Sequence, residues 1–379
     1  MDLNDLRLEI DEIDRQMVDL FCKRMEVAVK VSQYKIENGL PVLDANRERK
    51  KLAKISEMAG EDMAGYARTL YNTIFDMSRA EQEKYMHPTS PTAQKIKRSM
   101  DSTPKMFPEY ATVACQGVEG AYSQIAAQKL FKVPDIEYFS DFEAVFKAVK
   151  DGKCQYGVLP LENSTAGSVN LVYDLMMKYN FSIVRSTRIH IDHQLLAKAG
   201  TKLSDVKEIF SHPQAISQSS DFLRELGVKV TPCLNTALSA KMVAESERTD
   251  IAALSSRSCA SLYGLEVLRT SVQDKGNNHT RFICISKNRE IYPGADKTSI
   301  MVVTPHRPGA LFRVMSRFNA LGINLAKLES RPIPDRDFEF MFYFDLETSV
   351  YSPEFMQLIA ELDFMCEDFR YLGSYSEVI

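Results

Sequence analysis

The stretch that decides the fold of the N-terminal part lies at residues 3–36 and reads LNDLRLEIDEIDRQMVDLFCKRMEVAVKVSQYKI. Its apolar residues recur at steps of three and four, which is the spacing of one face of an α-helix. Arg24 occupies the one polar slot in this stripe, and the pattern predicts a single helix of about 35 residues. The stripe comprises Leu3, Leu6, Ile10, Ile13, Met17, Leu20, Val27 and Val31.

Such a helix is too long to be covered by its own module. At about 1.5 Å per residue it spans roughly 50 Å, whereas a compact fold of about 85 residues has a radius of gyration of about 12 Å. Its apolar face must therefore pack against another subunit. We expect an all-α domain that forms an intertwined homodimer, alone or within a higher assembly.

The composition is that of an ordinary globular protein and excludes several classes. The chain has 379 residues, 45% hydrophobic and 26% charged, which suits two or three domains. Its 47 basic and 51 acidic residues leave a net charge of -4, which argues against binding to nucleic acid or a membrane surface. The acidic, periodic start of the chain does not resemble a secretory signal, and we expect a cytoplasmic protein.

The cysteines and histidines indicate no metal site. The seven cysteines are dispersed without a Cys-x-x-Cys pair, which favours reduced thiols. His190 and His193 lie in a strand-like stretch with no cluster of Cys or Glu, and we interpret them as core or surface histidines.

Three compositional regimes divide the chain. Residues 1–88 carry helical periodicity with almost no Pro or Gly, and residues 89–108 are interpreted as a linker because prolines lie among Ser, Thr and Lys. Residues 109–287 alternate β-branched runs with helical stretches, as α/β folds do. A weaker joint then precedes a third domain at residues 298–376.

Cationic residues interrupt or flank the apolar stripe of the first helix. Arg24 lies within the stripe, Arg7 on its flank, and Lys35 near its end. A buried guanidinium is costly unless it is paired, so several on inward faces indicate a multiply anionic ligand between helices. Cations that face solvent and pair with neighbouring carboxylates are an equally open alternative on spacing alone.

A later helical stretch carries a second polar set. The chain turns at residues 41–47, and the residues that open the next helix are Asp44, Arg47 and Glu48. A later helix covers about residues 66–84, with one face formed by Tyr71, Phe75, Ser78 and Gln82. Jointly, these positions resemble the all-helical chorismate mutase domain over about residues 1–88.

The resemblance implies a role for each polar position. Arg7, Arg24 and Arg47 would hold the substrate carboxylates, with Arg7 reaching the site of the partner subunit. Lys35 and Gln82 would donate to the ether oxygen. The substrate hydroxyl and a carboxylate would be held by Asp44, Glu48 and Ser78. Because the rearrangement of chorismate is intramolecular, clamping one conformer and stabilising charge on the breaking C–O bond meets its needs.

A glycine-rich turn follows the strand-like residues 111–115. Gly117, Gly120 and the later Glu137 partly match a dinucleotide site. Cys115 stands where that fingerprint has its first glycine, and a tight turn or an anion-binding helix N-terminus explains the same glycines. We expect no organic cofactor.

Three motifs place small polar residues at the ends of strand-like runs. They are Glu162-Asn-Ser-Thr165, Ser211-His-Pro-Gln-Ala-Ile-Ser-Gln218 and Asn278-His-Thr-Arg-Phe282. Open α/β sheets bind ligands at strand ends, although each motif taken singly fits a helix cap or a turn better. Together and in this order, the motifs resemble the catalytic domain of prephenate dehydratase over about residues 109–287.

That resemblance implies two α/β lobes, similar to a periplasmic-binding-protein fold, with the site in the cleft. Thr280 would be the essential catalytic residue, as a hydrogen-bond donor to the leaving hydroxyl. Arg281 would act on the substrate charge. The pocket would be lined by Asn163, Ser164, Thr165, Ser211 and Gln218.

The last part of the chain predicts a βαββαβ order, which is an α+β, ferredoxin-like arrangement. Two motifs in it resemble the ACT regulatory domain, in which they bind phenylalanine; a helix cap plus a strand exit is the alternative. The motif residues are Gly309, Ala310, Leu311, Glu329, Ser330, Arg331 and Pro332. Phe312 stands where many members of the family have Val, and the bulkier side chain is expected to tighten the pocket.

The three resemblances follow one another in the order expected of the bifunctional chorismate mutase–prephenate dehydratases. Such an enzyme would turn chorismate into prephenate and then phenylpyruvate, without metal or cofactor, under inhibition by phenylalanine. One alternative is a mutase fused to an NAD-dependent prephenate dehydrogenase, which would need the full glycine fingerprint. Another is an amino-acid sensor that consumes neither substrate.

Overall fold

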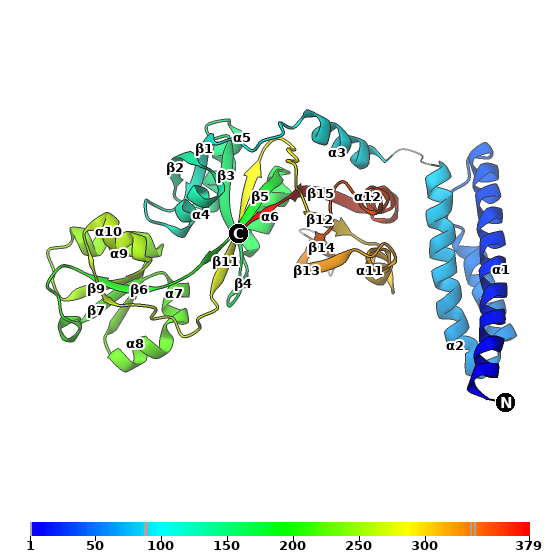
Figure 1. Cartoon of the computed structure of the whole chain (residues 1–379), viewed down its shortest axis with the longest axis horizontal. Coiled ribbons are helices and arrows are strands. Elements are labelled where there is room, and N and C mark those ends of the chain that lie inside the picture. Colours follow the sequence, from blue (N-terminus) through cyan, green and yellow to red (C-terminus); the bar gives the residue numbers. More distant parts are fainter. Residues whose placement is uncertain (1, 87–89, 334–335, 337–338) are drawn as a thin grey trace.

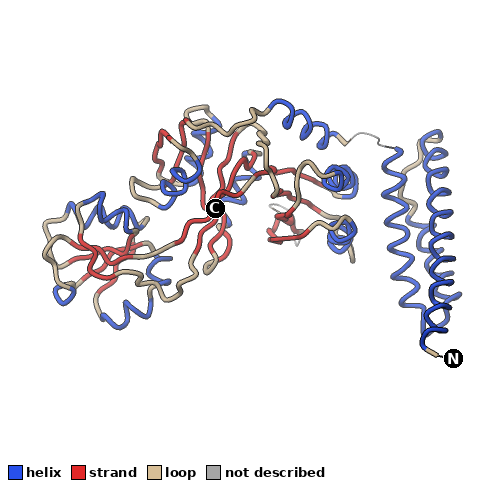
Figure 2. Tube along the Cα trace, in the orientation of Figure 1, coloured by secondary structure: helices blue, strands red, loops and turns tan. Residues whose placement is uncertain are grey.

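The computed structural model describes residues 2–86, 90–333, 336 and 339–379. The chain forms a helical module, a two-lobed α/β region and a C-terminal α/β unit that lies between them (Figure 1). Figure 2 shows the contrast between the long helices near the N-terminus and the sheets of the other parts. Within the described ranges, the structure has no helix both long and apolar enough to cross a membrane.

The first helix, α1 (Leu3–Glu37), confirms the helix predicted from the apolar stripe. The Asp2 carboxylate caps it by accepting from the backbone N–H groups of Asn4 and Asp5, at 2.7 and 2.9 Å. Helix α2 (Ala45–Met86) contains both the helix expected to open at Asp44, Arg47 and Glu48 and the stretch predicted at 66–84. It is interrupted at Gly60, whose φ of 74° breaks it into two helical segments.

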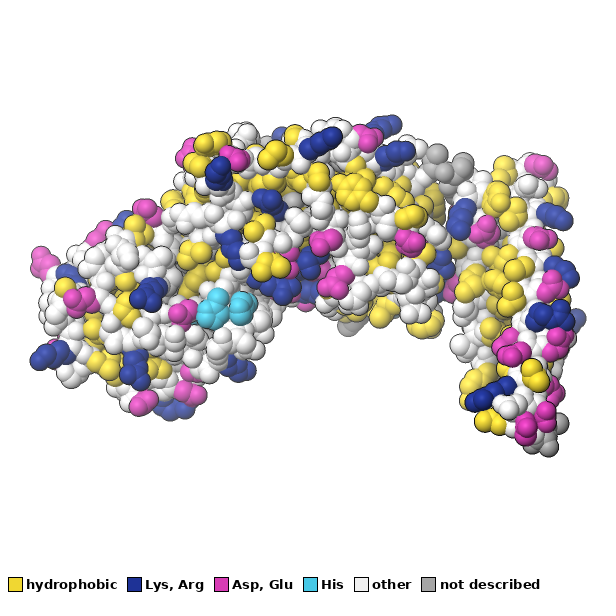
Figure 3. Space-filling model, in the orientation of Figure 1, with side chains coloured by type: hydrophobic (Ala, Val, Ile, Leu, Met, Phe, Trp, Pro, Cys, Tyr) yellow, Lys and Arg dark blue, Asp and Glu magenta, His cyan; other side chains and the backbone are white. Residues whose placement is uncertain are grey.

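The apolar stripe of α1 is not covered within one chain. Leu3, Ile10 and Leu20 are 63%, 55% and 65% exposed. Of the described residues of α1, Ala28 and Ser32 are the buried ones. Figure 3 shows apolar side chains at the surface of this module, at the right of the view. The long helix therefore leaves its apolar face available, as its length requires.

The segment interpreted as a linker contains a helix, α3 (Pro91–Ser102). Ile96 is fully buried in the core of the C-terminal unit. The backbone N–H of Thr92 donates to the carboxylate of Asp363 in that unit at 3.0 Å. Pro91 begins this helix, since proline lacks only an N–H that has no partner in the first helical turn.

The first lobe is built on a sheet with strand order β16-β5-β11-β3-β1-β2, in which β4 pairs with β3. Strands β3 and β11 are antiparallel neighbours, with Thr280 opposite Asn163 and Arg281 opposite Glu162. The strands are β1 (Tyr110–Gln116), β2 (Val133–Phe139), β3 (Tyr156–Asn163), β4 (Gly167–Ser168), β5 (Ser182–His190), β11 (His279–Ser286) and β16 (Glu377–Val378). The helices are α4 (Tyr122–Leu130), α5 (Phe142–Lys150) and α6 (Asn170–Tyr179).

The second lobe is inserted between β5 and β11, and its sheet has the order β10-β6-β9-β7-β8. The chain crosses between the lobes at residues 191–193 and 270–278, which gives the two-lobed arrangement that was expected. The strands are β6 (Gln194–Ala197), β7 (Glu208–Ser211), β8 (Lys229–Pro232), β9 (Ile251–Ser255) and β10 (Glu266–Arg269). The helices are α7 (Pro213–Gln218), α8 (Ser220–Leu226), α9 (Thr236–Glu245), α10 (Arg257–Tyr263) and the short 3-10 turn η1 (Leu203–Asp205).

The C-terminal unit has the predicted βαββαβ order. Its sheet runs β13-β14-β12-β15, the ferredoxin-like arrangement. Helices α11, α12 and α3 pack on one face around Phe344 and Phe355. The elements are β12 (Lys297–Val303), α11 (Ala310–Ala320), β13 (Asn324–Pro332), β14 (Phe340–Glu347), α12 (Pro353–Met365) and β15 (Asp368–Tyr375).

The other face of this sheet shares a core with the first lobe. Met301, Tyr343 and Leu372 of the sheet cluster with Tyr173 and Ile183 of the lobe. The final strand β16 then leaves the C-terminal unit and pairs with β5 in parallel. The two units are therefore joined both by apolar packing and by a shared strand.

Gly373 permits the close approach of β15 to β5, and its replacement tests that packing. Its φ is 143°, and a Cβ there would lie 2.2 Å from the carbonyl oxygen of Ile183. We expect Gly373→Ala to lower the free energy of unfolding by about 3 kcal/mol, since backbone strain adds to displaced packing. Gly322→Ala is the control: φ is 65° with nothing within 4 Å, so it should cost only about 1 kcal/mol. Equal losses in denaturant titrations would contradict this account.

Candidate active sites

The first candidate site lies between α1 and α2. The Arg24 guanidinium donates to the hydroxyl of Ser78, and Lys35 Nζ donates to Gln82 Oε1 at 3.0 Å. Ser78 and Gln82 are buried on one face of α2, with Gln82 Nε2 also donating to the Ser78 carbonyl at 3.1 Å. The structure thus brings together four of the residues expected at this site.

Both cations of this site are held by neutral groups. Arg24 contacts the Ser78 hydroxyl, and its guanidinium carbon lies 5.6 Å from the centroid of the Phe75 ring. Burial lowers the pKa of Lys35 below its ordinary 10.5, although nearby carboxylates oppose this, and burial also lowers the pKa of Arg24. Partly desolvated cations with neutral partners are suited to an anionic ligand.

The acidic residues expected at this site have partners of their own. Asp44 caps α2, and its carboxylate accepts from the backbone N–H of Arg47 at 3.0 Å, while the Arg47 side chain is exposed. Glu48 forms an ion pair with Arg79, which also pairs with Asp76. Arg79 was not among the residues expected at this site. Its spacing from Asp76 indicates only a surface ion pair along one helix, and nothing in the sequence indicates its pairing with Glu48.

Arg7 is not brought to this site by its own chain. At about 1.5 Å per residue, it lies roughly 25 Å from Arg24 along the axis of α1. Its side chain is exposed. A site that contains both arginines therefore needs a second chain.

The second candidate site lies where the two lobes meet. Asn163, buried at the end of β3, donates from Nδ2 to Asn278 Oδ1 at 2.7 Å and to Thr280 Oγ1 at 2.9 Å. Its Oδ1 accepts from the backbone N–H groups of Thr165 and Ala166 at 3.0 and 2.9 Å. Because both partners are donors, they identify which terminal atom of the Asn163 amide is the oxygen and which is the nitrogen. Because Thr280 Oγ1 accepts from Asn163, its own proton remains the donor of this hydroxyl.

Gln218 joins the second lobe to this cluster. Its Nε2 donates to Thr165 Oγ1 at 2.9 Å and to Asn163 Oδ1 at 3.3 Å. Its Oε1 accepts from Asn278 Nδ2 at 3.0 Å. One carboxamide at the end of α7 therefore links the end of β3 to the crossing before β11.

His193 was interpreted as a core or surface histidine, and the structure places it both in the core and at this site. It is 2% exposed, and its Nε2 lies 3.1 Å from Gln218 Oε1. An amide oxygen only accepts, so Nε2 carries the proton. Burial lowers the pKa of His193 below 6.5, which favours the neutral ring at neutral pH. The signal that could have indicated this contact with Gln218 is the position of His193 in the segment that crosses between the lobes.

Two residues expected to line the pocket make structural hydrogen bonds instead. Ser164 Oγ donates to the carbonyl of Asn277 at 2.8 Å and accepts from the backbone N–H of His279 at 2.9 Å. Ser211 is fully buried and donates to the carbonyl of Leu254 at 2.8 Å. Ser164 therefore connects the end of β3 to the backbone at the start of β11, while Ser211 stabilises the sheet of the second lobe.

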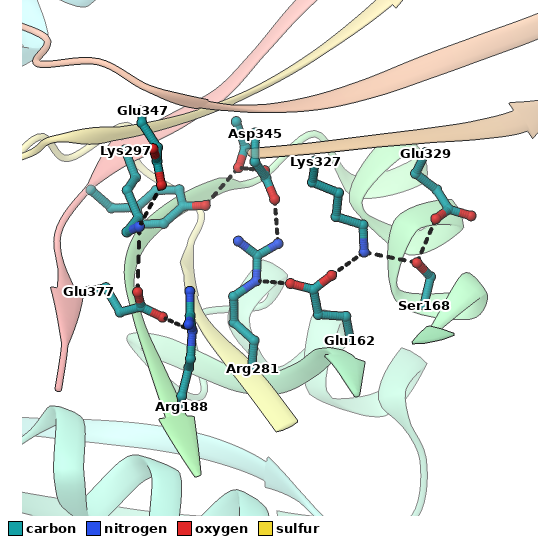
Figure 4. A network of polar contacts seen from close by, with 12 residues as sticks. Glu162, Ser168, Arg188, Arg281, Lys297, Lys327, Glu329, Asp345, Glu347 and Glu377 are labelled. Carbon is teal, nitrogen blue, oxygen red and sulfur yellow. Dashed lines mark hydrogen bonds and ion pairs between the residues drawn. The ribbon is translucent and has the colours of Figure 1, made fainter. Parts of the chain in front are cut away.

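Arg281 points away from the cluster, which corrects the expectation that it acts on the substrate charge. Adjacent residues of a strand face opposite sides, so Arg281 and Thr280 diverge, as do Glu162 and Asn163. The Arg281 Nε lies 2.8 Å from Glu162 Oε1, and the guanidinium also pairs with Asp345 of β14 (Figure 4). The motif could not reveal this, because Asp345 comes from another domain.

The first expected regulatory motif forms the start of α11. Gly309 is the N-cap residue, with a φ of 77° and no side-chain cap, so the first N–H groups of the helix lack a side-chain partner. Ala310 is buried and Leu311 is half-buried. Phe312 is 66% exposed.

The second expected regulatory motif lies on β13 and is divided between two faces. Glu329 accepts from the hydroxyl of Ser168 at 2.6 Å, and Arg331 pairs with Asp174 at 2.9 Å, so both face the first lobe. The residues that alternate with them and are exposed are Ser330 and Pro332.

The glycine-rich turn after β1 is explained by packing. A Cβ on Gly120 would lie 2.7 Å from Cys259 Sγ of α10. Glu137 is paired with Lys153 rather than left free for a ribose. In the part of the chain that the structure describes, no group of three or more His, Cys, Asp or Glu is arranged to hold a metal ion.

Comparisons with known proteins identify a family for each of two parts of the chain. The prephenate dehydratase family model matches residues 113–290, and the chorismate mutase type II model matches residues 6–83. The chain is 30% identical to the bifunctional chorismate mutase/prephenate dehydratase of Escherichia coli K12 over 98% of this chain and 95% of that protein.

Solved structures are similar over much of the chain. A prephenate dehydratase from Arthrobacter aurescens in complex with L-Phe has a TM-score of 0.64 at 27% identity, over 70% of this chain and 89% of that one. A structure described as a novel type of quorum quenching acylase has a TM-score of 0.64 at 31% identity, over 70% of this chain and 97% of that one. Because one scaffold carries more than one described activity, the site residues have to identify the chemistry.

The helical site generates a prediction about pH. Gln82 is a neutral amide, and burial lowers the pKa of Lys35 below its ordinary 10.5, so Lys35 loses its positive charge at a lower alkaline pH than a free lysine. We therefore expect kcat/KM at this site to stay level through neutral pH and to fall with one alkaline ionisation. The residual activity of Lys35→Arg should lack that fall, since a guanidinium stays charged. A steep loss between about pH 6 and pH 8 would contradict these roles.

Proposed function

Because the chain belongs to the bifunctional chorismate mutase/prephenate dehydratase family, we propose that each of its two reactions takes place at one of the sites described above. The enzyme is both an isomerase, acting on chorismate, and a lyase, acting on prephenate. We assign the rearrangement to the site between α1 and α2, and the dehydration to the cluster between the lobes.

The helical site is suited to a reaction that needs only clamping and charge stabilisation. Arg24 binds a substrate carboxylate, and Lys35 donates to the ether oxygen, where negative charge grows as the C–O bond breaks. The Gln82 oxygen is occupied by Lys35 and one amide hydrogen by the Ser78 carbonyl. The second amide hydrogen of Gln82 is then available to the same ether oxygen.

We propose that two chains complete each mutase site. The exposed apolar face of α1 supports this, because a second copy would remove Leu3, Ile10 and Leu20 from water. Arg7 supports it independently, since its distance along α1 prevents it from reaching Arg24 of its own chain. In the assembled dimer, Arg7 of one chain would bind substrate beside Arg24 of the other.

The dehydratase assignment is carried by the hydrogen bond from Asn163 to Thr280. Prephenate must lose its hydroxyl group and carbon dioxide, and the leaving hydroxyl needs a donor. With its oxygen accepting from Asn163 at 2.9 Å, Thr280 directs its proton to that hydroxyl. Gln218, from the second lobe, closes the cluster and links the lobes across the cleft. The product is phenylpyruvate.

We assign feedback inhibition by phenylalanine to the C-terminal unit, as an ACT domain. The similar structure from Arthrobacter aurescens is described as an L-Phe complex. In this chain the uncapped start of α11 at Gly309 offers N–H groups for a carboxylate. Glu329 and Arg331 of β13 contact the first lobe, so a ligand there would act on the contact between domains.

The assignment of two separate sites predicts two separable losses. Thr280→Val removes the donor but keeps the shape of the side chain, so dehydration of prephenate should fall by at least a hundredfold. Its chorismate consumption should stay at the wild-type rate. Arg24→Ala should give the reverse pattern, with dehydration of supplied prephenate intact. Parallel assays of both substrates measure this, and unchanged dehydration in Thr280→Val would refute the second site.

One assay separates the proposed function from its alternatives. Purified enzyme is given chorismate without any added cofactor, and prephenate and phenylpyruvate are measured with and without phenylalanine. Release of phenylpyruvate without NAD excludes the dehydrogenase. Failure to consume chorismate or prephenate would leave the amino-acid sensor as the function.

The shared mutase site predicts rescue between two inactive variants. Arg7→Ala and Arg24→Ala, each purified alone, should lack mutase activity. A mixed dimer would hold one intact site, formed by Arg24 of one chain and Arg7 of the other. Random mixing by co-expression should therefore restore about one quarter of wild-type activity per chain. Co-expressed chains that stay inactive while forming mixed dimers would contradict the shared site.

A further inference from the structure

Four charged residues lie on the face of the β3–β11 pair opposite to Asn163 and Thr280, and Figure 4 shows their contacts with one another. Arg281 pairs with Glu162 and Asp345, and Lys327 also pairs with Glu162. The side chains of Arg281, Asp345 and Lys327 are 9%, 12% and 17% exposed, and that of Glu162 is 30% exposed. Two cations thus balance two carboxylates, and three of these four residues are largely buried. The four residues together form the ion cluster.

The ion cluster joins two domains at the strands that carry the site. Glu162 directly precedes Asn163 on β3, and Arg281 directly follows Thr280 on β11. Each domain supplies one cation and one carboxylate. The two members from the C-terminal sheet are Lys327 on β13 and Asp345 on β14.

The contacts continue from the ion cluster to the regulatory strand. Lys327 Nζ donates to Ser168 Oγ at 2.9 Å, and Ser168 donates to Glu329 at 2.6 Å (Figure 4). Glu329 belongs to the β13 motif to which phenylalanine binding is assigned. An unbroken series of polar contacts therefore leads from that motif to the residue next to Thr280.

Loss of one charge would disturb the remaining members of the ion cluster. In a buried pair, the attraction compensates for lost hydration, and removal of one partner leaves the other unpaired. The Asp345 carboxylate accepts from the Ser299 hydroxyl and pairs with Arg281, so two partners hold it in one position. Without that charge the guanidinium would reorient, and the β11 backbone at Thr280 would shift with it.

We propose that the ion cluster is the element by which the C-terminal domain sets the geometry of the dehydratase site, with Arg281 as a positioning residue for Thr280. The proposal rests on the dehydratase function assigned above and adds the route by which the regulatory domain acts on it. A regulatory ligand would change activity by favouring one of two arrangements of these contacts.

Asp345→Asn tests the proposal, because it removes the charge and keeps the shape. We expect kcat for prephenate dehydration to fall about tenfold or more, with KM changed less than about twofold, since Thr280 is displaced while substrate contacts remain. Inhibition by phenylalanine should weaken in the same variant. Mutase activity of the same preparation should be unchanged.

Asp174→Asn is the matched control. Asp174 of α6 pairs with Arg331 of β13 at 2.9 Å, so this variant also removes a carboxylate from an ion pair between the same domains. Asp174 contacts no residue of the cluster around Asn163 and Thr280, so kcat for dehydration measured without phenylalanine should equal that of the wild type. In addition, Arg281→Lys should retain more kcat than Arg281→Met, whereas an arginine that binds substrate would show its loss in KM.

Wild-type kcat and inhibition in Asp345→Asn would overturn the proposal, as would an equal loss in Asp174→Asn. A lowered Tm with parallel loss of both activities would overturn it too, because that indicates general destabilisation. If Asp345→Asn does not fold, Lys327→Met carries the same expectation at a more exposed position. Wild-type enzyme that leaves prephenate intact would instead refute the proposed function.

Discussion

The antiparallel pairing of β3 with β11 is the constraint on which the dehydratase site depends. One register places Thr280 opposite Asn163 on one face of the sheet and Arg281 opposite Glu162 on the other. A shift by a single residue would exchange these faces and bring the charged pair to the side of the proposed site. The side chains of β11 are buried on both faces, with Ile283 in one core and Phe282 in the other. A shift would force each of them into the opposite core, which is packed for different side chains. Side-chain packing therefore determines the polar chemistry on both sides of the sheet.

The helical module is governed by length rather than by register. Its apolar face is longer than one chain can cover, and its cations are spread along the same axis, so one physical cause underlies both the proposed dimer and the proposed shared site. The module meets the C-terminal unit through a looser contact, in which Arg313 lies 4.0 Å from Asp76 beside a cavity of about 690 Å³. The first lobe and the C-terminal unit, by contrast, share one core and the strand β16.

The features that were predictable from the sequence have local patterns. The stripe at residues 3–36 and the βαββαβ order are both encoded within short stretches. The predictions were less accurate where a proline or a histidine fits more than one structural role. Pro91 begins a docked helix rather than marking a loop, and His193 is a core residue that also holds Gln218.

By itself, the sequence determined the elements, their order and the chemical groups available to each site, because helix and strand periods and motif spacings are properties of neighbouring residues. Only the tertiary structure decided which of those groups meet. Arg281 carries the same charge in either role, and nothing near it in the chain indicates that Asp345, 64 positions away, is its partner. A buried ion pair is selected by the packing of two domains, and that selection has no local pattern.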